Sequence, residues 1–230
     1  MKKHWSGYFS KTEQMLWSGS VLLITVAFAA FDRENWLTLA ASLIGVTSLI
    51  FNAKGNPAGQ ALMVIFSLLY GVISYGFSYY GEMVTYLGMT MPMAVFALVS
   101  WLRNPYQGNR SEVAVNRIGR RETALMWVLT LVVTAVFGWI LGVFHTANLP
   151  LSTLSVTTSF LAVYLTFRRD PRYAIAYAAN DVILIMLWLL AAAENSSYLS
   201  VAICFAAFLA NDLYGFVSWR SMERRQAAAC

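Results

Sequence analysis

The sequence predicts an all-α polytopic membrane protein with eight transmembrane helices. One extra N-terminal helix precedes two parallel three-helix repeats, which are joined by a linker helix (1+3+1+3). Composition supports this fold class, because 59% of the 230 residues are apolar and only 12% are charged. A soluble domain carries roughly 25% charged residues. The mean hydropathy is +0.58. Two further observations support the prediction: apolar runs of membrane-spanning length and an alternating distribution of basic residues between them.

The apolar runs have the length of membrane spans. A hydrocarbon core of ~30 Å needs about 20 apolar residues in a helix. Eight segments fit this requirement: Met15–Phe31, Trp36–Phe51, Ala58–Tyr80, Met83–Trp101, Thr123–Phe144, Leu149–Phe167, Tyr173–Ala193 and Tyr198–Trp219. No small-x-small cleavage site follows the first segment, so we interpret it as a span and not as a signal peptide.

The basic residues between the spans predict the orientation. Alternate junctions hold 15 of the 16 Lys and Arg residues, beginning with Lys2, Lys3 and Lys11 before the first span. The remaining one, Arg33, lies between the first two spans. Cytoplasmic loops carry the excess of basic residues in membrane proteins. We therefore expect both termini in the cytoplasm, and this asymmetry also explains the net charge of +5 without a nucleic-acid partner.

The two three-helix units are predicted from recurring landmarks. Spans four and eight both end in Val-Ser-Trp, at Trp101 and Trp219, and Pro57 and Pro171 introduce spans three and seven. Secondary transporters are commonly built from such repeats, with the substrate held between them. The predicted divisions are an extra helix (1–34), a first repeat (35–104), a basic loop with a linker helix (105–147), a second repeat (148–221) and a cytoplasmic tail (222–230).

Two Asn-Asp pairs interrupt the last two spans. They are Asn180 with Asp181, and Asn211 with Asp212, and each follows an alanine. Burying such groups costs several kcal/mol unless partners are built in. Asp181 lies ~12 Å and Asp212 ~10 Å from the same end of their helices at helical rise. The sequence therefore predicts one polar site at a single depth within the membrane.

Aromatic residues share a helix face with this predicted site. A series at three- and four-residue steps runs along span seven, with members Tyr173, Tyr177, Asp181, Leu184 and Trp188. An aromatic face above amides and carboxylates suits a flat polar ligand, including a cation. The alternative is that the Asn and Asp side chains only tie helices together, as polar pairs often do in membranes.

The first repeat is less polar at the matching depth. Span three has a stripe of small residues, Ser67, Gly71, Ser74 and Ser78. Such stripes usually indicate close helix packing, and Tyr70 is expected beside the stripe. Gln60 is the better ligand candidate in this repeat. Pro92 in span four is expected to kink its helix.

Several function classes are excluded by missing motifs. The chain has no Gly-x-x-x-x-Gly-Lys-[Ser/Thr] loop for nucleotide and no His-Glu-x-x-His zinc motif. Its two cysteines form neither a disulfide framework nor a metal-binding spacing. We therefore expect no cofactor, no metal site and no enzymatic activity.

The closing segment Asn-Asp-Leu-Tyr-Gly-Phe-Val-Ser-Trp-Arg (211–220) and the 1+3+1+3 arrangement resemble the PnuC family of bacterial vitamin transporters, relatives of the SWEET sugar carriers. The resemblance implies a multi-pass protein of the bacterial inner membrane. It implies uptake of nicotinamide riboside, an NAD precursor, by facilitated diffusion, made one-way by phosphorylation of the substrate in the cytoplasm. It also implies a homotrimer.

The resemblance assigns aromatic and amide binding positions to Trp188, Asn180 and Asn211. With the residue pattern, we expect Trp188 and Tyr177 to stack on the substrate ring. We expect three amides to bind the polar edges of the substrate: Asn180, Asn211 and Gln60. We expect the carboxylates of Asp181 and Asp212 to balance its positive charge. Asp212 stands where a related segment often has Asn, and the first repeat lacks a matching Asn.

Alternative functions stay open at this point. Some members of the family carry thiamine or riboflavin. A proton-coupled carrier would use Asp181 or Asp212 to take up a proton in each cycle. Two aspartates at equal depth could also form the dyad of an intramembrane aspartic protease, but the chain lacks a Gly-x-Gly-Asp motif. A structural partner protein is disfavoured by the buried polar cluster.

Overall fold

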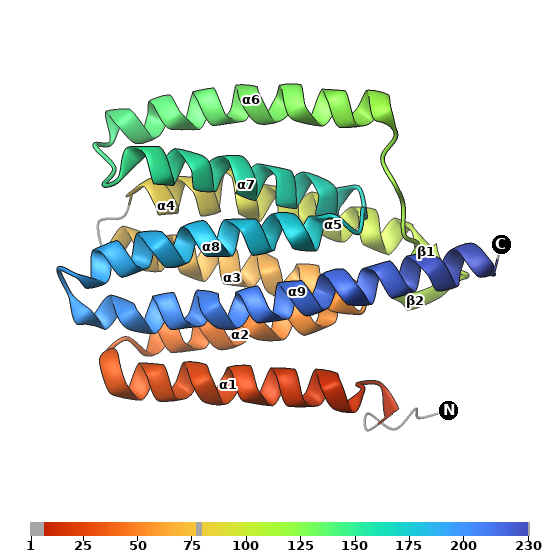
Figure 1. The fold of residues 1–230 in the computed structure, drawn as a ribbon, viewed down its shortest axis with the longest axis horizontal. Coiled ribbons are helices and arrows are strands. Elements are labelled where there is room, and N and C mark those ends of the chain that lie inside the picture. Colours follow the sequence, from red (N-terminus) through yellow and green to blue (C-terminus); the bar gives the residue numbers. More distant parts are fainter. Residues whose placement is uncertain (1–6, 77–79, 230) are drawn as a thin grey trace.

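The computed structural model describes residues 7–76 and 80–229. Eight helical segments of these residues are long and apolar enough to cross a membrane. They run up and down in alternation, and α1 begins at the end where α9 finishes (Figure 1). We call this the termini end and the other the opposite end. Lys2, Lys3 and Ser78 lie outside the described residues.

The predicted all-helical fold with eight spans is confirmed. The helices are α1 (Lys11–Phe31), α2 (Trp36–Ala53), α3 (Pro57–Gly76), α4 (Tyr80–Thr85), a π-helical turn (Tyr86–Thr90), α5 (Met91–Arg103), α6 (Arg120–Val143), α7 (Leu149–Phe167), α8 (Tyr173–Ala192), a 3₁₀ turn (Ser196–Tyr198) and α9 (Leu199–Ala228). A short antiparallel hairpin of β1 (Pro105–Tyr106) and β2 (Asn109–Val113) follows α5.

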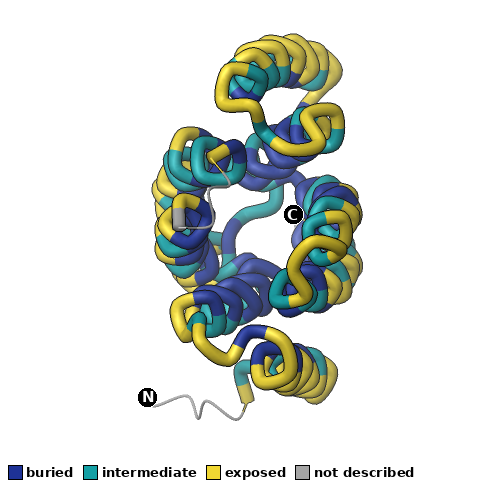
Figure 2. The backbone as a smooth tube through the Cα atoms, turned by 90° about the vertical axis from the view of Figure 1, so that its left-hand side faces the viewer, coloured by how far each residue is buried: buried dark blue, intermediate teal, exposed yellow. Residues whose placement is uncertain are grey.

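Six of the helices form a closed ring. Around it, α2 packs on α3, α3 on α5, α5 on α7, α7 on α8, α8 on α9 and α9 on α2. Helix α1 lies outside the ring against α2 and α9, and α6 lies outside against α7 (Figure 2). The two outer helices are the predicted extra helix and linker helix. The middle helices of the predicted repeats, α3 and α8, therefore face each other across the ring.

Helices α2 and α7 end in the same way. Gly55 and Arg169 both adopt left-handed backbone angles, with φ of 64° and 60°. This conformation ends a helix and strongly favours glycine. The next residues, Asn56 and Asp170, donate their amides back to the last turn and precede proline. Proline cannot continue the hydrogen-bonding pattern of the preceding helix but suits the first turn of the next.

The ring is joined at its two seams by what we call the Ser-Trp clamps. In each clamp, a serine hydroxyl and a tryptophan N–H donate to the last carbonyls of a helix in the other predicted repeat. The bonds are Ser100 to Phe167 (2.9 Å), Trp101 to Thr166 (2.9 Å), Ser218 to Ala53 (2.7 Å) and Trp219 to Asn52 (2.7 Å). The two indole rings meet with centroids 5.4 Å apart. Matching contacts are what duplicated units would give, although the duplication itself stays a prediction.

Span four, in which the sequence predicts a kink at Pro92, departs from a regular α-helix just before that proline. Its middle turn, Tyr86–Thr90, is π-helical, and the Met91 amide donates to the Tyr86 carbonyl. Pro92 follows at once and has no amide hydrogen to donate, so regular α-helical bonding cannot continue through this turn. Such widened turns occur frequently at functional sites.

The last helix is longer than the predicted span, because α9 continues past Trp219 to Ala228. The added segment packs on the connection after the hairpin. Gln226 donates to the Val113 carbonyl at 3.1 Å and accepts from the Val115 amide at 2.8 Å. Arg225 forms an ion pair with Glu112 at 2.7 Å. These partners lie more than a hundred residues away in sequence, so the span pattern could not predict them.

The connection between α5 and α6 crosses the termini end of the ring. The Val113 amide donates to the Gly55 carbonyl at 2.9 Å, and the Asn116 amide donates to the Arg169 carbonyl at 3.0 Å. It therefore bonds to the ends of both α2 and α7. The Lys and Arg residues of the described chain also gather at this end, except Arg33.

Asp170 fixes this connection from a fully buried position. Its carboxylate accepts from the Ile118 amide at 3.1 Å and from the Arg172 amide and guanidinium at 2.8 to 3.0 Å. Burial alone would raise the pKa of Asp170, but the hydrogen bonds from Arg172 and Ile118 prevail and lower it.

We predict that Asp170→Asn lowers the melting temperature of the detergent-solubilised protein at pH 7 by about 4 °C or more, for a loss of about 2 kcal/mol. Because the folded pKa lies below the unfolded value of about 3.9, the carboxylate stabilises the fold above that pH. The difference from wild type should shrink as the pH falls below about 4. An equal difference at pH 7 and pH 3, or an equal effect of Glu34→Gln at the opposite end, would contradict this.

Candidate functional site

The predicted face of α8 points into the ring. Asp181, Leu184 and Trp188 are all buried, and Tyr177 is half-buried. Asp212 of the neighbouring helix α9 is buried as well, and its carboxyl group lies near that of Asp181. Two neighbouring helices therefore place buried carboxyl groups together in the ring.

Two of the three predicted amides, Asn180 and Asn211, are bonded to neighbouring helices. Oδ1 of Asn180 accepts from Thr158 and Ser159 of α7 at 2.9 and 3.0 Å. Nδ2 of Asn211 donates to Ser20 of α1 at 2.9 Å. These bonds tie helices together, yet each amide keeps an atom without a partner among the described residues. These atoms are Nδ2 of Asn180 and Oδ1 of Asn211, the second of which is buried.

Gln60 lies apart from the carboxyl pair. It sits in the first turn of α3, near the termini end, and its Nε2 donates to Asn52 Oδ1 at 2.8 Å. The structure thus brings Asp181, Asp212 and Trp188 toward the ring interior. It keeps Gln60 at the edge of that interior. Tyr177 packs nearer the termini end, with its ring centroid 6.2 Å from that of Tyr173.

An aromatic cluster fills the ring beside these residues. Its members are Phe66, Tyr70, Tyr86, Trp188, Phe205 and Phe208. The expectation that Tyr70 lies to the side was wrong, because Tyr70 is 6% exposed and packs within the cluster. Its ring lies 4.4 Å from that of Tyr86 and 6.4 Å from that of Trp188, between centroids. Tyr70 recurs at helical spacing with Ser67 and Ser74, and this signal could have placed it inside.

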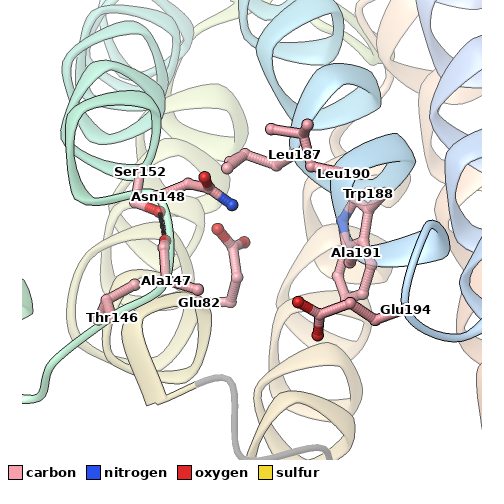
Figure 3. A pocket seen from close by; sticks show the side chains of 10 residues that line it. All are labelled: Glu82, Thr146, Ala147, Asn148, Ser152, Leu187, Trp188, Leu190, Ala191 and Glu194. Carbon is pink, nitrogen blue, oxygen red and sulfur yellow. Dashed lines mark hydrogen bonds between the residues drawn. The ribbon is translucent and has the colours of Figure 1, made fainter.

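A small cavity of about 70 Å³ opens on the other side of Trp188, at the opposite end of the ring. It lies between α4 of the first predicted repeat and α7 and α8 of the second. Figure 3 shows Glu82 beside Asn148 and Ser152 on one side of the cavity, and Glu194 near Trp188 on the other. Trp188 therefore separates this cavity from the aromatic cluster. The sequence pattern gave no signal for Glu82, which precedes the predicted start of span four.

The termini end of the ring is closed. Trp101, Trp219 and Tyr173 are 0 to 2% exposed there, and Val113 of the hairpin is fully buried beside them. The cavity at the opposite end has room for only a few water molecules. A solute of nucleoside size would need the ring to open at one end to enter and at the other to leave.

Comparison with known proteins identifies the family. The sequence profile described as Nicotinamide mononucleotide transporter matches residues 35–221. The chain is 25% identical over 218 residues to the nicotinamide riboside transporter PnuC of Neisseria mucosa, covering 93% of this chain and 83% of that protein. It is 22% identical over 219 residues to the nicotinamide riboside transporter PnuC of Haemophilus influenzae, covering 94% and 92%.

The fold agrees with a solved structure. The chain superposes on the crystal structure of the vitamin B3 transporter PnuC with a TM-score of 0.83 and 23% identity, covering 96% of this chain and 95% of that one. The suggested kinship with SWEET carriers receives no support from these comparisons. The resemblance to PnuC proteins is confirmed, since the profile match spans most of the chain. This chain therefore belongs to the nicotinamide mononucleotide transporter family of membrane proteins, which includes the PnuC transporters, and is not an enzyme.

Proposed function

We propose that this protein takes up nicotinamide riboside by facilitated diffusion, with alternating access between the two predicted repeats. The observation that carries the proposal is the ring interior, where the Asp181–Asp212 carboxyl pair lies beside the aromatic cluster. A flat pyridinium ring matches both features, because aromatic faces and carboxylates both attract cations. Both curated relatives are named for the riboside.

The charges favour the riboside over the mononucleotide in the family's description. Every Lys and Arg of the described chain lies at a span end, in a connection or in the extension of α9 past Trp219. None is thus available inside the ring to pair with a phosphate, which carries about −1.5 to −2 charges at pH 7. Beside the carboxyl pair, that phosphate would meet repulsion that the riboside avoids.

We propose these roles for the site residues. Trp188 stacks on the substrate ring in the bound state, and Tyr177, eleven residues nearer the termini end on α8, stacks on it during passage. Asp181 and Asp212 balance its positive charge. The free Nδ2 of Asn180 and Oδ1 of Asn211 bind polar edges. Gln60, near the termini end, contacts the substrate as it leaves.

The setting in the cell is proposed with the same reasoning. The basic termini end faces the cytoplasm of a bacterium, by the positive-inside rule, and the protein lies in the inner membrane as a homotrimer, as the PnuC resemblance implies. The predicted division into an extra helix, two repeats, a linker and a tail is supported by the ring and its two matching clamps. The SWEET relationship stays a prediction.

One observation supports proton-coupled transport as an alternative function. The neighbouring buried carboxyl groups of Asp181 and Asp212 could take up and release a proton as the ring opens and closes. The protein would then couple uptake to a proton gradient. Thiamine and riboflavin remain the alternative substrates, as both are flat vitamins.

We predict that titration calorimetry of the detergent-solubilised protein detects micromolar or tighter binding of nicotinamide riboside. Nicotinamide mononucleotide should bind at least about tenfold more weakly, because its phosphate meets carboxyl groups without a basic partner. Thiamine and riboflavin serve as competitors of similar size. Tighter binding of either vitamin would reassign the substrate, and equal binding of the mononucleotide would overturn the charge argument.

We predict that Trp188→Ala weakens riboside binding at least about tenfold, since stacking a base on an aromatic side chain contributes 1–3 kcal/mol. Trp139→Ala on α6, where the tryptophan is 72% exposed outside the ring, is the matched control and should bind normally. Calorimetry on samples that elute as a single species from gel filtration checks both. Wild-type affinity in Trp188→Ala would move this residue from the site to the scaffold.

We predict that uptake into proteoliposomes continues when an ionophore abolishes the pH gradient, as facilitated diffusion requires. The measurement is the initial rate of radiolabelled riboside uptake into proteoliposomes with an imposed pH gradient, with and without the ionophore. Liposomes without protein give the background. Uptake that stops with the gradient would support proton coupling through the carboxyl pair.

A further inference from the structure

The inner face of α3 carries two buried hydroxyls that the fold does not use. Ser67 and Ser74 are 0% and 1% exposed, and neither Oγ has a hydrogen-bond partner among the described residues. A serine in a helix usually bonds the carbonyl one turn back when nothing better is offered. Leaving a buried hydroxyl unpaired costs free energy. Such groups in a native structure call for a ligand or a water molecule.

Both hydroxyls lie on the face of α3 that is turned toward α8. Ser67, Tyr70 and Ser74 follow each other at three- and four-residue steps, so they form one stripe. Tyr70, in the middle, packs against Trp188 of α8 and Phe205 of α9 across the ring. Close helix packing, the expected reason for small residues in this stripe, holds for Gly71, whose missing side chain makes room for Leu87. It does not account for the hydroxyls.

The depth of the two serines matches the site residues opposite. Pro57 and Pro171 begin or precede α3 and α8, which start at the same end of the ring and run in the same direction. Counted from these prolines, Ser67 is level with Asp181, and Ser74 is level with Trp188. The two levels are roughly 10 Å apart at helical rise. An extended nucleoside, with its base at one level and its sugar at the other, spans about this length.

We propose that Ser67 and Ser74 complete the substrate site from the first repeat. Ser74 hydrogen-bonds the carboxamide of the ring that stacks on Trp188, and Ser67 hydrogen-bonds the ribose hydroxyls opposite Asp181. A hydroxyl both donates and accepts, which suits an amide and a diol equally. Asp181 Oδ2, which has no hydrogen-bond donor among the described residues, faces the same ring interior and is available to the same ribose. This inference rests on the proposed function, since it divides one nucleoside between two levels.

The test compares Ser67→Ala, Ser74→Ala and the control Ser48→Ala. Ser48 is equally buried on α2, but its hydroxyl already donates to the Gly45 carbonyl at 2.8 Å. Riboside affinity by calorimetry should fall about fivefold to tenfold in the first two variants and stay unchanged in Ser48→Ala. The melting temperature without ligand should stay or rise in Ser67→Ala and Ser74→Ala, because each removes an unpaired buried group. A structural hydroxyl would instead lower it.

A second ligand separates the two roles. 1-Methylnicotinamide keeps the cationic ring and the carboxamide but lacks the ribose. As a competitor of radiolabelled riboside, it should bind Ser67→Ala as it binds wild type and should bind Ser74→Ala more weakly. Equal losses in both variants would overturn the division into two levels.

The outcomes also separate this inference from the function on which it rests. Wild-type protein that does not bind the riboside would contradict the proposed function. Wild-type binding with unchanged affinity in both serine variants would leave that function intact and overturn this inference alone.

Discussion

The Ser-Trp clamps hold the ring together where its two halves meet. Each clamp satisfies the last carbonyls of a helix, α2 or α7, with donors from a helix of the other half. Helix ends leave such carbonyls without partners, and a membrane interior offers no water to bond them. The connection carrying Val113 then bonds the next carbonyls, and Asp170 anchors that connection. The termini end of the ring is therefore closed by the clamps and by the connection between α5 and α6 together.

The ring interior contrasts with its end. Near the termini end, the side chains of Gln60 and Asn52 and the clamp donors all form hydrogen bonds within the protein. These bonds fix the side chains of this region in one conformation. Deeper inside, Asp181 Oδ2 and Asn211 Oδ1 are buried without a hydrogen-bond partner among the residues described. Unpaired polar groups are costly in a low-dielectric interior. A ligand that pairs them therefore gains binding free energy.

The two middle helices give the site two unlike walls. At the same levels, α8 presents Asp181 and Trp188, whereas α3 presents Ser67 and Ser74. One wall therefore supplies charge and a stacking surface, and the other supplies hydroxyls and space. A symmetric pair of walls would bind a symmetric ligand best. The difference suits a nucleoside, whose flat cationic ring and polar sugar have different needs.

The sequence by itself determined the spans, their helix breaks, the uneven distribution of basic residues and the depth of the Asn-Asp pairs. All of these depend on local composition or on helical rise along one segment, so no knowledge of neighbours is needed. Only the tertiary structure decided that Asn180 and Asn211 are bonded to α7 and α1, and that Tyr70 points inward. It also decided which hydroxyls stay unpaired. Partners of that kind come from segments far apart in the chain, and helix packing chooses among them.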